Sequence, residues 1–273
     1  MESVTHLQPL TDAIARVRQR ATAFSTSFFA DRDQVEAWIG HRVLFYSEGP
    51  GGVLIFRRDR DFYRLYHVAA DAGSLSEELS SLDRVPWPGG GVLVSDLVGR
   101  PEDISTVADV YRMHGFRKYG FLFRMACLCE IPPADGSEDS DVVFAMKEDV
   151  LAVAEFLEQL LDPFVDQIPG AGDLRDAAVR GNVLIVRRSG LLAGLLIFAR
   201  TGLTTTLRYW YVSHNFRGQG VGARLIRKFF RLCGDGSRVV LWVVGSNADG
   251  IAKYRHYGFK SERLEDQIMV RDK

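Results

Sequence analysis

The chain has 273 residues, and at roughly 150 residues per domain this length favours two domains. Apolar residues make up 47% and charged residues 25% of the sequence, which excludes wholesale disorder, collagen-like repeats and coiled-coil architecture. Lys plus Arg number 34 and Asp plus Glu number 35, for a formal net charge of −1. This balance gives no global attraction to nucleic acid or to an anionic membrane, and neither is expected as a partner.

The three cysteines, Cys127, Cys129 and Cys233, are too few and odd in number for a disulfide framework, which favours a reducing compartment. Cys127 and Cys129 have no nearby histidine, so no metal site is expected. Residues 1–10 lack the apolar core of a signal peptide. The longest aliphatic run, residues 191–199, is shorter than the roughly 20 residues that span a bilayer. We therefore expect a soluble, cytoplasmic protein.

Three segments of the first half recur in the second half in the same order. Residues 52–58 resemble residues 194–200, and the pairs 64–68 with 208–212 and 111–116 with 254–259 follow, at offsets of 142, 144 and 143 residues. The Tyr-Arg-x-x-Gly-Phe pair carries the most weight, because many strands read as similar aliphatic runs. The pattern predicts two copies of one fold. The alternative is two unrelated α/β halves with similar strands.

Residues 131–141 combine two prolines, one glycine and four acidic residues without a periodic apolar pattern. This composition is typical of a linker. It predicts one domain over residues 1–130 and a second over residues 142–273.

The second half shows alternating strand and helix patterns. We expect strands at 142–146, 183–187, 192–200, 204–212, 239–244 and 268–270, and helices at 147–162, 173–180 and 249–257. A further helix, opened by a glycine-rich turn, is expected from apolar residues at 225, 226, 229, 230 and 233. Ser189-Gly190 and Thr201-Gly202 separate the strands between 183 and 212, which favours an antiparallel meander. Pro163 and Gly258 end two of the helices.

A glycine-rich turn, Arg-Gly-Gln-Gly-Val-Gly at residues 217–222, lies between a strand and an amphipathic helix. Glycine allows positive φ and a close approach of a ligand to the backbone. The amides and the dipole at the start of a helix favour an anion, and Arg217 adds a positive charge. The turn therefore predicts a phosphate or diphosphate site. Arg224, Lys228 and Arg231 share one helix face, which either meets a further phosphate or is solvated.

Other glycine-rich motifs fit this turn less well. A dinucleotide-binding turn needs a parallel βαβ unit and an acidic residue about 20 positions further on, whereas an antiparallel meander precedes this one. A P-loop needs Gly-Lys-Ser/Thr, which is missing here. The first copy has no such turn after Val68, so only the C-terminal copy is expected to bind the anion.

Residues 212–222 resemble the phosphate-binding signature of the GNAT superfamily of N-acetyltransferases, Arg/Gln-x-x-Gly-x-Gly/Ala, with Arg217, Gly220 and Gly222 at its fixed positions. Residues 247–259 resemble the Asn…Ala-x-Tyr-x-x-x-Gly-Phe segment of that family. His214 and Gly250 depart from the common pattern, where many members have proline and alanine. The first copy looks like a degenerate GNAT half. The resemblance implies an α/β (α+β type) fold of two tandem GNAT-like domains, each with a mixed, largely antiparallel sheet flanked by helices.

The resemblance also implies acetyl-CoA as the cofactor and assigns its contacts. Backbone groups near Tyr211, Val212 and Ser213 would pair with the pantetheine arm and supply an oxyanion donor. The turn formed by Arg217, Gly218, Gln219, Gly220, Val221 and Gly222 would hold the diphosphate. Asn247 would contact the cofactor from the end of the next strand.

Tyr254 is the candidate general acid, because a phenol with a pKa of about 10 suits protonation of a departing thiolate. The alternative is a tyrosine that packs in the core, which is also the interpretation of Tyr111 in the first copy. The general base stays open among five candidates: Asp162, Asp166, Asp173, His214 and His256.

The sequence thus predicts an acetyl-CoA-dependent N-acetyltransferase that moves an acetyl group to a primary amine by direct attack in a ternary complex. The acceptor, a small molecule or a peptide, is not identified by the sequence. The first alternative is a non-catalytic acyl-CoA-binding regulatory or interaction protein, suggested by the missing base. The second is a nucleotide-dependent enzyme that uses the glycine turn.

Overall fold

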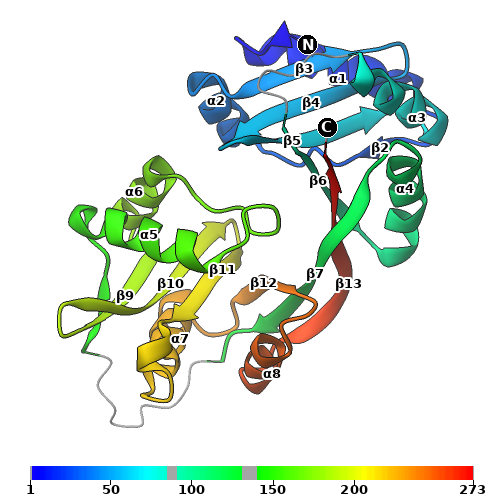
Figure 1. Ribbon diagram of the computed structural model, residues 1–273. Helices are drawn as coiled ribbons and strands as arrows, with labels where there is room; N and C mark the ends of the chain where they lie inside the picture. The colour runs from blue at the N-terminus through cyan, green and yellow to red at the C-terminus, as the bar shows by residue number, and fades with distance from the viewer. Residues whose placement is uncertain (1, 85–90, 131–139, 273) are drawn as a thin grey trace. The chain divides into compact units, whose positions relative to one another are not determined.

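The structure, a computed structural model, describes residues 2–84, 91–130 and 140–272 (Figure 1). It divides into two compact units. The N-terminal unit comprises Met1–Phe121 and Arg263–Lys273, and the C-terminal unit comprises Leu122–Glu262. Except for residues 140 and 141, the predicted linker lies outside the described residues, so the boundaries 1–130 and 142–273 stay predictions. No helix of the described residues is long and apolar enough to cross a membrane.

The N-terminal unit is a sheet covered by helices on both faces. Its strands are β1 (Glu2–Ser3), β2 (Ser25–Thr26), β3 (Leu44–Glu48), β4 (Gly52–Asp59), β5 (Phe62–Ala69), β6 (Leu93–Gly99) and the end of β13 (Lys260–Arg271), and its helices are α1 (Leu7–Arg20), α2 (Arg32–Gly40), α3 (Ala72–Ser80) and α4 (Pro101–Met113). The main strand order is β1-β3-β4-β5-β6-β13. Neighbouring strands are antiparallel except β5 and β6, which are parallel. One apolar core lies under α1 and α2, and a second lies under α3 and α4.

The C-terminal unit has the same kind of architecture. Its strands are the end of β7 (Arg117–Leu128), β8 (Val142–Phe144), β9 (Val183–Arg188), β10 (Leu191–Thr201), β11 (Thr204–Val212) and β12 (Arg238–Val244), and its helices are α5 (Val150–Leu160), α6 (Ala171–Val179), α7 (Val221–Cys233) and α8 (Ala248–His256). The strand order is β7-β12-β11-β10-β9-β8, and only β11 and β12 are parallel. The predicted antiparallel meander β9-β10-β11 is confirmed.

The order strand, strand, helix, strand, helix occurs in both units, as β4-β5-α3-β6-α4 and as β10-β11-α7-β12-α8. The segments that repeat in the sequence fall on equivalent elements. Each series is followed by one more strand, β7 after the first and β13 after the second, and this strand pairs with a strand of the other series. Residues 122–128 of β7 pair with β12, and residues 265–271 of β13 pair with β6. Each sheet is therefore completed by a strand from the other half of the chain.

Helix α7 positions the glycine turn against the sheet of the C-terminal unit. Its buried residues Val221, Leu225, Ile226, Phe229 and Phe230 recur at helical spacing on one face, and they pack in the core above β10 and β11. Burial of a Leu, Ile or Phe side chain contributes roughly 1.5–3 kcal/mol, so this face fixes the start of the helix firmly. The helix ends at Cys233 and is followed by Gly234, whose φ of +85° few other residues adopt.

Candidate cofactor and active site

Strands β11 and β12 separate halfway along their length. Their parallel pairing runs from Thr204 to Leu207, although β11 continues to Val212 and β12 to Val244. At this point β11 carries one extra residue, Arg208, opposite the step from Ile197 to Phe198 in β10. Such a bulge bends a strand and increases its twist. Among the described residues, no strand pairs with residues 208–212 on the side of β12, so this edge offers backbone groups to an extended ligand.

The glycine turn follows this edge directly. Gly218 and Gly220 have φ of +76° and +74°, in the left-handed region that favours glycine. The first amide to bond within α7 belongs to Arg224, which donates to Gly220 O at 3.1 Å, and no side chain caps the helix. The amides of Val221, Gly222 and Ala223 precede this bond and therefore have no acceptor within the helix. The helix start presents a set of donors that suits a diphosphate.

The third glycine has a different role. A Cβ on Gly222 would lie 3.4 Å from both Trp210 Cζ2 and Val212 Cγ2, so the start of α7 packs closely on β11. The turn is also braced by side chains. Gln219 Nε2 donates to Asn215 O at 3.1 Å, and Arg224 Nη1 donates to Gln219 O at 3.2 Å. Arg217 is exposed beside the turn. The residues present fit the phosphate and pantetheine parts of coenzyme A.

Asn247 begins α8, where its Oδ1 accepts a hydrogen bond from Gly250 N at 2.9 Å. A Cβ on Gly250 would lie 2.6 Å from Asn247 Nδ2, so the asparagine side chain packs directly on this glycine. The side chain of Asn247 thus holds the start of the helix that carries Tyr254. Its predicted contact with the cofactor stays a prediction.

Tyr254 lies on α8 and packs against Trp210 of β11 and Phe259, with ring centroids 5.8 Å away in each case. Burial raises the pKa of Tyr254 to about 12, so the phenol stays protonated at neutral pH and can donate a hydrogen bond. Tyr257 packs against the same Trp210 at 5.6 Å and against Phe230 at 6.2 Å. Tyr254 and Tyr257, the residue that follows the end of α8, therefore share the contact with Trp210 and form a natural pair for comparison.

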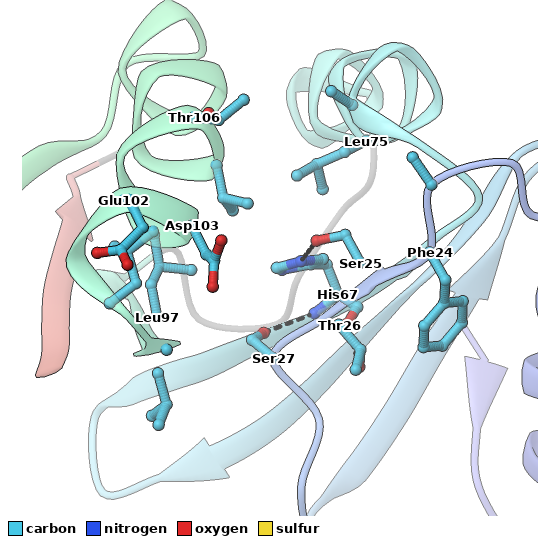
Figure 2. A pocket seen from close by; sticks show the side chains of 16 residues that line it. Phe24, Ser25, Thr26, Ser27, His67, Leu75, Leu97, Glu102, Asp103 and Thr106 are labelled. Atoms are coloured by element: carbon cyan, nitrogen blue, oxygen red, sulfur yellow. Dashed lines mark hydrogen bonds between the residues drawn. The ribbon is translucent and has the colours of Figure 1, made fainter. Parts of the chain in front are cut away.

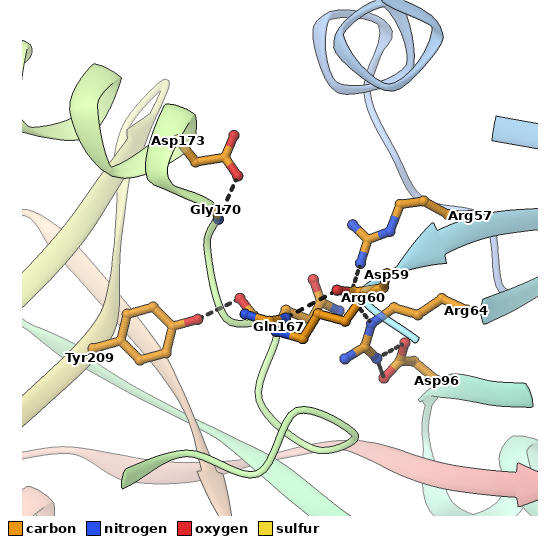
Figure 3. A network of polar contacts seen from close by, with 9 residues as sticks. All are labelled: Arg57, Asp59, Arg60, Arg64, Asp96, Gln167, Gly170, Asp173 and Tyr209. Carbon is orange, nitrogen blue, oxygen red and sulfur yellow. Dashed lines mark hydrogen bonds and ion pairs between the residues drawn. The ribbon is translucent and has the colours of Figure 1, made fainter. Parts of the chain in front are cut away.

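The loop between α5 and α6 lies against the tyrosines of β11. The Tyr209 hydroxyl donates to Gln167 O at 2.6 Å (Figure 3). Burial, and after it the negative charge of Asp166, raise the pKa of Tyr211, so the Asp166 carboxylate lies near that phenol. The loop is closed by Asp162 N, which donates to Asp166 Oδ2 at 3.1 Å.

The other candidate bases have different surroundings. Asp173 Oδ2 accepts from Gly170 N at 3.0 Å and so holds the start of α6 (Figure 3). His214 lies in an exposed turn, and the exposed His256 packs beside Tyr257 with ring centroids 5.0 Å apart. Among these candidates, Asp166 is one whose charge acts on β11, at Tyr211. The sequence could not single it out, because loop spacing does not fix which carboxylate faces a strand.

The equivalent position in the N-terminal unit is built differently. After β5, the Asp71 side chain caps α3 by accepting from Ser74 N at 2.8 Å, and this bond lowers the pKa of Asp71. A carboxylate therefore stands where the C-terminal unit has open amides. Strand β2 also pairs with the end of β5, and Ser27 N donates to His67 O at 3.0 Å. The chain itself covers the edge that is open on β11.

Comparison with known proteins places this fold among acetyltransferases. The chain is similar to a GCN5-related N-acetyltransferase from Sphaerobacter thermophilus, with a TM-score of 0.60 at 16% identity over 89% of this chain and 86% of that one. It is also similar to a putative GNAT-family acetyltransferase from Novosphingobium aromaticivorans, with a TM-score of 0.53 at 21% identity over 80% and 88% of the two chains. A tandem GNAT protein from the clavulanic acid biosynthesis pathway matches with a TM-score of 0.53 at 12% identity, over 81% and 78%.

The sequence itself matches a family over part of its length. Residues 151–259 match the sequence model of the acetyltransferase (GNAT) family, so the C-terminal half of the chain contains a GNAT domain. No curated protein matches the chain. The predicted GNAT resemblance and the predicted fold class are confirmed. The interpretation of the N-terminal unit as a degenerate copy stays a prediction.

Proposed function

We propose that the protein is an acetyl-CoA-dependent N-acetyltransferase with one cofactor site, in the C-terminal unit, and with a primary amine of a small molecule or peptide as acceptor. One observation carries this proposal. A strand edge opened by the bulge at Arg208 runs directly into an uncapped helix start, within a GNAT domain. An extended thioester arm joined to a diphosphate has the shape and charge for this site.

Coenzyme A supplies the activated acyl thioester. The amides at the start of α7, together with Arg217, would hold its diphosphate. Backbone groups of Tyr211, Val212 and Ser213 would align the pantetheine arm along the open edge of β11. A backbone N–H at this edge would polarise the thioester carbonyl as the amine attacks. Asn247, which follows the end of β12, would contact the cofactor.

Protons move at two points of this reaction. The phenol of Tyr254 would donate to the thiol sulfur as the bond to the acyl carbon breaks. A raised pKa favours hydrogen bonding over full ionisation of Tyr254. The incoming amine must lose a proton, and Asp166, whose charge acts on Tyr211, is our candidate to accept it or to hold the ammonium group.

The test is thiol release from acetyl-CoA in the presence of a panel of amines. The proposal requires amine-dependent release that disappears in Arg217→Ala/Gly220→Ala. The matched control is Gly202→Ala, which lies in the β10–β11 turn away from the site. Binding of coenzyme A without release for any amine would support the non-catalytic alternative.

The melting temperature with different ligands distinguishes the proposed function from the nucleotide-dependent alternative. A ligand at 100 times its Kd stabilises the folded protein by about 2.7 kcal/mol. Coenzyme A is expected to raise the melting temperature, whereas NAD and ATP leave it unchanged. Stabilisation by NAD or ATP and not by coenzyme A would contradict the proposed function.

A further inference from the structure

Asp141, the last residue of the predicted linker, lies in an ion-pair network next to the start of α7. Its carboxylate pairs with Arg188 at the end of β9 and with Arg224 Nε of α7, the latter at 3.2 Å. The side chains of Arg224 and Asp141 are 18% and 21% exposed, so water screens this pair less than a fully exposed one. Arg224, which the sequence assigned to a phosphate or to solvent, therefore has a partner within the protein.

The same arginine side chain also contacts the glycine turn. Arg224 Nη1 donates to Gln219 O at 3.2 Å, and it would lie 3.1 Å from a Cβ on Gly220. The guanidinium group thus lies against the two residues that precede α7. Because Nε pairs with Asp141 while Nη1 holds Gln219, one rigid planar group joins the carboxylate to the turn.

The turn needs such a support because its backbone is intrinsically flexible. Gly218 and Gly220 adopt positive φ, and glycine loses more conformational freedom on ordering than any other residue. No side chain caps α7. An arginine side chain is itself flexible, so Arg224 holds the turn firmly only when it is fixed in turn. Asp141 fixes Arg224, and Arg188 anchors Asp141 to β9.

The N-terminal unit holds the equivalent helix start in a different way. There the Asp71 carboxylate caps α3 directly. The segment that contains β2 covers the adjoining strand, where Ser25 and Ser27 hydrogen-bond to His67 beside a pocket of about 640 Å³ (Figure 2). A direct cap occupies amides of the helix start. The support through Arg224 acts at a carbonyl oxygen and leaves the amides of α7 open for an anion.

We propose that Asp141 is a positioning residue for the cofactor turn and acts through Arg224. This inference rests on the proposed function, because it concerns the same site. With the carboxylate in place, Arg224 keeps the Gln219 carbonyl fixed, and the amides that follow are ordered before the diphosphate binds. Such preorganisation lowers the entropic cost of binding. Two arginines flank one carboxylate, so the network keeps a net positive charge near the anion site.

Positioning and charge alone predict opposite effects of Asp141→Asn. Removal of a negative charge near an anion site strengthens anion binding if nothing else changes. Loss of the support weakens it, because the turn must then be ordered as the ligand binds. We expect calorimetry on the full-length protein to show about fivefold weaker binding of coenzyme A. The matched control is Asp149→Asn, which alters the neighbouring ion pair with Arg187 of β9 and should leave the affinity within twofold.

A double-mutant cycle tests the route through Arg224. Arg224→Gln alone should weaken binding of coenzyme A. In this background Asp141→Asn should change the affinity by less than twofold, because the group through which it acts is gone. In assays of thiol release, KM for acetyl-CoA should rise in Asp141→Asn while kcat stays within twofold, since the turn acts on binding of the cofactor.

Trypsin reports on the turn without any cofactor. Arg217 is exposed within the turn, and mass spectrometry identifies the fragments that end and begin at this bond. Local loosening of a segment increases its cleavage. Relative to cleavage at other sites, cleavage after Arg217 should be about fivefold faster in Asp141→Asn than in the wild type. It should be unchanged in Asp149→Asn.

Equal or tighter binding of coenzyme A in Asp141→Asn would overturn the proposal, as would an equal loss of affinity in Asp149→Asn. So would an undiminished effect of Asp141→Asn in the Arg224→Gln background, or an unchanged rate of cleavage after Arg217. A wild type that does not bind coenzyme A would contradict the proposed function. The cleavage rates alone would then decide whether Asp141 holds the turn.

Discussion

The three glycines of the turn at residues 217–222 differ in what their missing side chains allow. Gly218 and Gly220 adopt positive φ, whereas Gly222 allows α7 to approach Trp210 and Val212. The spacing of the motif predicted an anion site but could not separate these roles. A positive φ and a close packing contact both require glycine, so the sequence is the same in the two cases. Only the conformation distinguishes them.

Gly220→Ala is expected to destabilise the fold by about 1 kcal/mol, because alanine is strained at φ of +74°. It should also weaken coenzyme A binding at least tenfold, since the amides of the turn would shift. The control Gly202→Ala carries similar strain at φ of +57°, with open space around its Cβ. Calorimetry should show reduced affinity in the first variant only. Equal affinity in both variants would mean that the turn does not hold the cofactor.

Tyr254→Phe is expected to lower kcat roughly 100-fold, the lower range for loss of a general acid. KM for acetyl-CoA should change less than threefold, because the ring contacts with Trp210 and Phe259 remain. Tyr257→Phe, which packs on the same Trp210, serves as the control and should retain activity. Steady-state thiol release measures both. A kcat that falls equally in the two variants would point to packing rather than proton donation.

Asp266 is a half-buried acid near a second acid, Asp96. Its Oδ1 is buried without a hydrogen-bond partner, while Arg64 engages the neighbouring Asp96 at 2.9 and 3.1 Å (Figure 3). Burial, and after it the charge of Asp96, raise the pKa of Asp266 well above its ordinary value. Because the pKa of Asp266 is raised in the folded state, its contribution to the free energy of unfolding is fully present below the unfolded pKa of about 3.9. It is lost as the pH rises through the folded pKa.

Asp266→Asn is therefore expected to stabilise the protein at pH 7–8 by about 1–3 kcal/mol, because the amide stays neutral and each unit by which the pKa of the carboxyl is raised costs about 1.4 kcal/mol on ionisation. Its melting temperature should vary less between pH 4 and 8 than that of the wild type. Asp272→Asn, at an exposed position near Arg117, should change neither. Thermal unfolding across this pH range checks the result, and a destabilised Asp266→Asn would show that the charge is compensated.

At the scale of elements, the sequence predicted most of the C-terminal unit. The strands of the meander and the helix with apolar residues from Leu225 to Cys233 have strong periodic patterns, and they occur where expected. Strand β13 was expected only over residues 268–270, yet it begins at Lys260. Its first half is mostly charged and partly exposed, so no apolar alternation marks it. Strand β2 has two residues, too few for any periodic signal.

Strand β2 and the Asp71 cap together lead to a prediction about stoichiometry. Both features occupy, in the N-terminal unit, the positions that would bind cofactor in the C-terminal unit. We expect isothermal titration with coenzyme A to give one site per chain, and Arg217→Ala/Gly220→Ala to remove it. Two sites per chain, or one site that survives this double substitution, would contradict the assignment to the C-terminal unit.

At the scale of the molecule, the two units share strands in a way that the repeat did not reveal. A sequence repeat shows which elements are equivalent. The pattern of apolar residues in a strand does not show which other strand it pairs with. β7 follows the first copy in sequence and pairs with β12, and β13 follows the second copy and pairs with β6. The domain boundary predicted at residues 131–141 rests on linker composition, which is blind to such an exchange.

This exchange predicts how the halves behave when separated. Residues 140–273 alone would lack the β7 residues that pair with Arg238–Val244, and residues 1–130 alone would lack the β13 residues that pair with β6. Each fragment would expose an unpaired, apolar strand edge, so we expect both to be insoluble when expressed singly. Expressed together, they should form a soluble complex that binds one coenzyme A, because each supplies the strand that the other needs. Copurification through a tag on one fragment measures this. A soluble fragment 140–273 that binds coenzyme A by itself would show that β7 is dispensable to the C-terminal unit.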